Sequence, residues 1–163
     1  MDTNKILVAI DGSENSRRAI DYVAAIIKDC QWFKVKLLYI ERSPDRDFFA
    51  DDDLWKKACV KQRKAMHDFL SKGKQLLLQR GIEEERVQTD YVESCNSPLG
   101  GNPDYCSRGT SIAQDILHVA KEEGFGTVAI GRRGVSKAEE FMFGSVSSKI
   151  IHSGSNCTIW VVQ

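Results

Sequence analysis

Short runs of apolar residues punctuate the chain, and each has the length of a β-strand. They cover residues 5–10, 35–40, 87–92, 127–130 and 158–162. The first run is almost continuously apolar, which is typical of a strand covered on both faces in the centre of a parallel sheet. The third run is more polar, which favours a place at the edge of the sheet.

Between these runs, apolar residues recur with the period of a helix. The first such segment has one apolar face, made by Ile20, Val23, Ala24 and Ile27. A much longer segment before Gly81 has an apolar face made by Leu54, Ala58, Ala65, Phe69 and Leu76. Both segments therefore predict helices that pack against the sheet.

Two further helices are expected in the second half of the chain. Ser111, with Gln114 three residues later, is a plausible capping box for the first of them. That helix would bury Ile112, Ile116, Val119 and Ala120. A short helix is expected to begin near Gly144 and to lead into the last apolar run.

Strands and helices thus alternate along the whole chain. This order predicts an α/β fold in which right-handed crossovers join parallel strands. We expect residues 1–163 to form a single domain with one doubly wound, open, five-stranded parallel sheet and helices on both faces. In the order of the apolar runs, the expected strand order is 3-2-1-4-5.

Charge and hydropathy exclude several classes of partner. The 163 residues include 23 basic and 23 acidic side chains, so the basic excess that nucleic acids and membrane surfaces require is lacking. No stretch approaches the ~20 apolar residues of a membrane span. The apolar run near the N-terminus is too short for a signal peptide, so we expect a cytoplasmic protein.

Two strand ends carry the candidate chemistry, because ligands of open α/β sheets bind beyond the carboxyl ends of the strands. The first run ends in Asp11-Gly12-Ser13. The fourth is followed by Gly131, Gly134 and Gly144 with two and nine residues between them, and then by Ser145. Glycines let a backbone approach phosphates, and a helix start at Gly144 would favour an anion. An ordinary loop with capping glycine and serine residues would show the same local features.

Other functional motifs are absent from the sequence. There is no G-x-x-x-x-G-K-[ST] loop, no dinucleotide fingerprint after the first strand and no Gly-x-Ser-x-Gly elbow. His67, His118 and His152 have no metal-binding spacing, so we expect no metal site built from side chains alone.

The glycine spacing, its position after the fourth strand and the opening segment, residues 6–13, together resemble the universal stress protein family. The closing segments, residues 144–151 and 157–162, are also similar to that family's last helix and strand. The resemblance covers nearly the whole chain. It implies ATP, or AMP or ADP, as ligand, with Mg²⁺ or Mn²⁺ held mainly by the phosphates.

The resemblance also implies roles for individual residues. Asp11 would contact the ribose or the metal, Ala9 and Ile40 would flank the adenine, and Gly131 would lie by the ribose. The residues expected around the phosphates are Arg133, Gly134, Gly144, Ser145, Val146 and Ser147. No catalytic residue is implied.

Residues 94–108 depart from the family pattern and look like a loop insertion. Since they follow the third strand, we expect them to form a lid or rim near the nucleotide crevice. Cys95 and Cys106 bracket the insertion and are interpreted as loop thiols, with a redox-sensitive disulfide or a metal site as alternatives.

The function expected from the resemblance is an ATP-binding regulatory or stress-response module. A slow ATP hydrolase or phosphotransferase is one alternative, and a dimeric interaction protein without nucleotide is another. The resemblance also implies a homodimer that pairs through the last strand. The apolar run at residues 158–162 would suit such pairing. The sequence does not indicate a protein partner.

Overall fold

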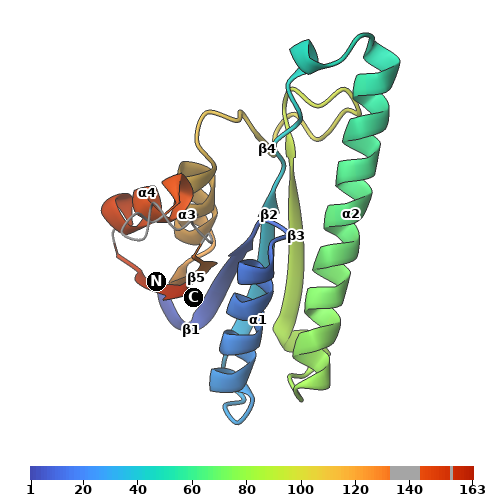
Figure 1. The fold of residues 1–163 in the computed structure, drawn as a ribbon. Coiled ribbons are helices and arrows are strands. Elements are labelled where there is room, and N and C mark those ends of the chain that lie inside the picture. Colours follow the sequence, from blue (N-terminus) through green and yellow to red (C-terminus); the bar gives the residue numbers. More distant parts are fainter. Residues whose placement is uncertain (133–143, 155) are drawn as a thin grey trace.

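The computed structural model describes residues 1–132, 144–154 and 156–163. Among them, six parallel strands form one sheet in the order β4-β3-β2-β1-β5-β6 (Figure 1). The strands are β1 (Asp2–Ile10), β2 (Lys34–Ile40), β3 (Val87–Ser94), β4 (Cys106–Ser107), β5 (Phe125–Gly131) and β6 (Thr158–Val162). The helices are α1 (Glu14–Ile27), α2 (Asp52–Gln79), α3 (Ile112–Glu122) and α4 (Ser145–Ser153), with 3₁₀ turns at Arg46–Phe48 and Glu84–Arg86.

The predicted α/β class, strand order and parallel pairing are confirmed, but the sheet has one more strand than the sequence predicted. The additional strand, β4, is two residues long and pairs with the end of β3 through Glu93↔Cys106 and Ser94↔Ser107. A strand of two residues is too short to show an alternation of apolar and polar side chains in the sequence. It also lies in a segment rich in proline and glycine, which is typical of a loop. As a result β3, predicted as a possible edge strand, is covered at its carboxyl end.

The centre of the sheet is the most buried part of the molecule. Residues 6–10 of β1 are all buried, between β2 on one side and β5 on the other. Side chains alternate along the strand, so Ile6, Val8 and Ile10 join one core cluster and Leu7 and Ala9 join the other. The continuous apolar run of the sequence therefore reflects a strand with helices on both faces.

The helices form two layers. Figure 1 shows α1 and α2 on one face of the sheet and α3 and α4 on the other. The predicted apolar face of α1, Ile20, Val23, Ala24 and Ile27, is entirely buried. On the opposite face α3 buries Ala113, Ile116, Val119 and Ala120, while Ser111 Oγ accepts a hydrogen bond from the backbone N–H of Gln114 at 3.4 Å.

The predicted apolar face of α2 was wrong by one position. The structure buries Cys59, Leu70, Gly73 and Leu77, whereas Leu54 is 47% exposed. Figure 1 shows the first turns of α2 extending beyond the sheet, so Leu54 has no layer to pack against. Phe69 and Leu76 lie at the border of the core and are partly buried.

Within the described ranges, no helix combines the length and the hydropathy that a membrane crossing needs.

Candidate functional site

A pocket of about 220 Å³ opens at the carboxyl ends of β1, β2 and β5. The chain passes from β1 to β2 on one side and reaches β5 on the other, so the strand order reverses here. This is the position at which open α/β sheets bind ligands. The pocket is lined by Ala9, Ile10, Asp11, Ser16, Tyr39, Ile40, Arg42, Ile112, Ile116, Ile130, Gly131, Gly144, Ser145, Val146 and Ser147.

The structure brings together, in this pocket, eight of the ten residues that the resemblance singled out. They are Ala9, Asp11, Ile40, Gly131, Gly144, Ser145, Val146 and Ser147. The other two, Arg133 and Gly134, lie outside the described residues. The nucleotide contacts expected of all ten stay predictions.

The turn after β1 is held by a local network around Asp11. Its Oδ1 accepts hydrogen bonds from Ser16 Oγ at 2.5 Å and from the backbone N–H of Ser13 at 3.0 Å. Ser13 in turn caps α1, because its Oγ accepts from the N–H of Ser16 at 3.2 Å. The carboxylate is thus fixed at the mouth of the pocket before any ligand arrives.

Two glycines shape this end of the sheet. Gly12 has φ +80°, in the left-handed region that favours glycine, and a Cβ there would lie 2.7 Å from Met66 Cε. At Gly131 a Cβ would lie 2.5 Å from the carbonyl carbon and oxygen of Asn15. The end of β5 can therefore approach the start of α1 only without a side chain at position 131.

The start of α4 forms the polar side of the pocket. Gly144 is the N-cap and provides no side-chain cap, while its carbonyl accepts the N–H of Ser148 at 2.9 Å. Among the described residues, no protein acceptor is recorded for the N–H groups of Ser145, Val146 and Ser147. The φ of Gly144 is −55°, which any residue can adopt, so the backbone conformation does not require glycine at this position. Helix-start N–H groups without an acceptor among the described residues, together with the helix dipole, make this end suited to an anion.

The opposite walls of the pocket are apolar, and sequence reasoning did not assign them to the site. Ile112 and Ile116 come from α3 and Ile130 from β5. Ile112 and Ile116 were predicted to face the core, and Ile112 is only half-buried because it borders the pocket. No spacing in the sequence links these positions to the glycine loop.

Tyr39 and Arg42 are further lining residues that the sequence did not indicate. The Tyr39 hydroxyl accepts a hydrogen bond from Gln62 Nε2 at 3.3 Å, and its ring lies 5.2 Å from that of Tyr91. Burial raises the pKa of the Tyr39 phenol, against the smaller opposing effect of the Gln62 hydrogen bond, so it stays protonated near neutral pH.

Carboxylates are scarce at the site. Asp11 is the single acidic residue among the described lining. In residues 1–132, 144–154 and 156–163, no group of three or more His, Cys, Asp or Glu side chains could hold a metal ion. A divalent cation here would need most of its ligands from a bound anion.

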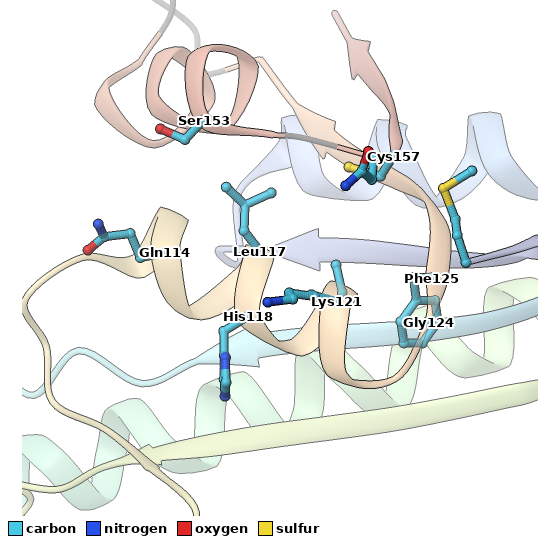
Figure 2. A pocket seen from close by; sticks show the side chains of 11 residues that line it. Gln114, Leu117, His118, Lys121, Gly124, Phe125, Ser153 and Cys157 are labelled. Carbon is cyan, nitrogen blue, oxygen red and sulfur yellow. The ribbon is translucent and has the colours of Figure 1, made fainter.

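A second, larger pocket of about 830 Å³ lies at the opposite end of the sheet. Figure 2 shows its lining, in which α3 contributes Gln114, Leu117, His118 and Lys121. Gly124 and Phe125 at the start of β5, and Cys157 before β6, also border it. None of the eight predicted site residues that the structure describes lies there.

A disulfide closes the loop insertion at residues 94–108. Cys95 and Cys106 form a disulfide with 5.1 Å between their Cα atoms, so their interpretation as loop thiols was wrong. Arg63 of α2 reaches the same loop, donating hydrogen bonds to Ser97 Oγ at 3.2 Å and to the Gly100 carbonyl at 3.4 Å. It also pairs with Glu93 of β3 at 3.2 Å and with the buried Glu41 at 2.9 Å. None of residues 94–108 lines the 220 Å³ pocket, so the loop does not form the rim of that pocket in this structure.

Comparison with known proteins agrees with this architecture. A sequence model of the universal stress protein family matches residues 3–163. The chain is 27% identical to universal stress protein YxiE of Bacillus subtilis (strain 168), with 98% of this chain and 99% of that protein aligned.

Two solved structures share the fold. Universal stress protein UspA of Lactobacillus plantarum superposes with a TM-score of 0.69 at 15% identity, covering all of both chains. The universal stress protein of Archaeoglobus fulgidus in complex with dAMP superposes with a TM-score of 0.61 at 16% identity, covering 99% of this chain and 98% of that one. With the family model matching nearly the entire length, the chain belongs to the universal stress protein family.

Proposed function

We propose that the chain binds an adenine nucleotide, with ATP as the leading candidate, in the 220 Å³ pocket, and that it acts as a nucleotide-dependent regulatory module of the stress response. The observation that carries this proposal is the gathering of eight family-implied residues around one cavity at the strand-order reversal. A relative with the same fold, from Archaeoglobus fulgidus, is described in complex with dAMP. Its nucleotide is an adenine nucleotide, the class proposed here.

The chemistry of the walls supports an orientation for the nucleotide. A flat, apolar adenine suits the side formed by Ala9, Ile40 and Ile116, where it would be taken out of water. The ribose would lie between Gly131 and Asp11, since a carboxylate accepts hydrogen bonds from hydroxyls. The phosphates would lie at the start of α4, where the N–H groups have no acceptor within residues 1–132, 144–154 and 156–163.

A cation such as Mg²⁺ is proposed only as a companion of the phosphates. Asp11 can offer it one carboxylate oxygen, and the phosphate oxygens would supply the other charged ligands. Binding of ATP in the presence of a chelator, compared with binding in Mg²⁺, measures how much the cation contributes.

The proposal predicts that Gly144→Val abolishes ATP binding with only a modest effect on folding. A branched side chain at the N-cap would stand in front of the N–H groups at the start of α4, while the core lies elsewhere. At ~100 times its dissociation constant a ligand stabilises the native state by about 2.7 kcal/mol, which raises the melting temperature of a domain of this size by roughly 5–11 °C. The nucleotide-stripped parent should show this rise with Mg-ATP, and Gly144→Val should not.

Ser153→Val is the matched control, because it places the same side chain at the exposed far end of α4. It should keep the full rise. Equal rises in the parent and in Gly144→Val would mean that this helix start does not hold the phosphates.

A further inference from the structure

A third cavity adjoins the proposed nucleotide pocket. It has a volume of about 190 Å³ and lies between the start of α3 and the start of α4. Arg42, Ile112, Ser145 and Val146 line both cavities, so the two are neighbours that share a wall. A ligand in the 220 Å³ pocket that reaches this wall therefore lies next to the third cavity.

The charge of this third cavity is one-sided. Arg42 and Lys149 both line it, and no carboxylate is among its described lining residues. Both cations are exposed, and neither forms an ion pair within the described residues.

Hydroxyl and amide groups complete the lining. Thr110 and Ser145 contribute hydroxyls, and Ser111 is occupied as the cap of α3. The N–H groups of Ile112 and Ala113, in the first turn of α3, have no recorded acceptor among the described residues. Donors and positive charge therefore converge from three segments, the β2 end and two helix starts, on one small space.

From this arrangement we infer that Arg42 and Lys149 form a second anion site that takes the terminal phosphoryl groups of the nucleotide and so selects ATP over AMP. The inference rests on the proposed function, because it takes the first phosphate to lie at the start of α4. A guanidinium binds a phosphoryl group through two parallel N–H donors, and an ammonium adds a point charge. Arg42 and Lys149 would both contact only a ligand whose phosphate chain extends past Ser145.

The test uses the double variant Arg42→Gln/Lys149→Gln. Both side chains are exposed and unpaired, so the variant should keep the parent's melting temperature. The control Lys57→Gln/Lys72→Gln removes the same two positive charges from exposed positions of α2 that do not line either cavity. Dissociation constants of AMP, ADP and ATP are measured by calorimetry in a chelator, with inorganic triphosphate as a fourth ligand.

In the parent and the control, ATP should bind at least about tenfold more tightly than AMP, since charge-assisted contacts of this kind are each worth about a factor of ten. The double variant should lose this preference, because its affinity for ATP should fall by about tenfold more than its affinity for AMP. A preserved ratio of ATP to AMP affinity in the double variant would overturn the inference, and so would an equal loss for both nucleotides.

The fourth ligand separates this inference from the proposed function. If the parent binds neither AMP nor ATP, the proposed function fails. Inorganic triphosphate that binds the parent and not the double variant would then retain the anion site with a free polyphosphate as its ligand. No binding of inorganic triphosphate in that case would remove the site as well.

Discussion

Gly131 is the residue at which the requirements of the fold and of the pocket coincide. It ends β5, borders the pocket and lies against the backbone of Asn15 and Ser16 at the start of α1. Because its neighbours are backbone atoms, they cannot turn aside as the end of a flexible side chain can. A side chain here would disturb both the packing of α1 and the shape of the site.

Gly131→Ala should therefore destabilise the protein by about 1–3 kcal/mol, the usual cost of overpacking. The added Cβ would lie 2.5 Å from Asn15 backbone atoms, and the helix must shift to relieve the contact. Urea unfolding of the parent and the variant measures the change. If the free energies of unfolding of the variant and the parent differ by less than about 0.5 kcal/mol, the contact between position 131 and the Asn15 backbone is looser than the structure indicates.

At the residue scale, local patterns in the sequence picked out residues of unusual identity, while Ala9, Ile40 and Val146 were named only through the family resemblance. Gly131, Gly144 and Ser145 stood out because glycines at fixed spacing before a helix are a recognisable pattern. Arg42 and Ile112 did not, because an arginine after a strand and an isoleucine in a helix are ordinary. They line the pocket only because the fold places Arg42, after the end of β2, near Ile112 at the start of α3.

Among the elements, β4 and the loop that precedes it differ most from expectation. The loop leaves β3, returns to it in the two residues of β4, and is closed by the disulfide between Cys95 and Cys106. Ser107 Oγ then donates to Asp115 Oδ2 at 2.6 Å, which ties the end of β4 to α3. The insertion is thus a braced extension of the sheet edge.

Cys95→Ser/Cys106→Ser should lower the free energy of unfolding by up to about 3 kcal/mol, the loop-closure estimate for a loop of this size. It should leave the affinity for ATP unchanged, because no residue of the 94–108 loop lines the proposed nucleotide pocket. Cys30→Ser, at one of the free cysteines, is the control. A large change in ATP affinity would instead support the lid that the sequence suggested.

Helices and strands differed in how well the sequence predicted them. The β1 and α1 patterns were read correctly because residues 6–10 of β1 and the apolar face of α1 are buried in the core. The α2 pattern misled, since its first turns run beyond the sheet and Leu54 obeys no core constraint. The pairing that makes β4 is local in space but carries no hydrophobic period, so no pattern could have revealed it.

As a whole molecule, the sheet has unequal edges. At one edge β3 is partly covered by β4, while at the other β6 pairs only with β5 among the described strands. Ile159, Trp160, Val161 and Val162 of β6 are all partly exposed. An apolar edge strand of this kind invites pairing with another chain.

We expect the chain to form a homodimer through β6. A two-fold axis would pair the two β6 edges and remove both from solvent. Sedimentation equilibrium should give the mass of two chains. A mass of one chain, independent of concentration, would contradict the expectation.

The central claim is that the pocket at the β1 and β5 ends binds an adenine nucleotide, and calorimetric titration of the nucleotide-stripped protein with ATP tests it most directly. Asp11→Asn is titrated in parallel, because Asp11 is the acidic residue in the described lining. The account predicts saturable binding of one ATP per chain, with affinity reduced about tenfold in the variant through loss of a charge-assisted hydrogen bond. A parent protein that shows no saturable binding of ATP would contradict it.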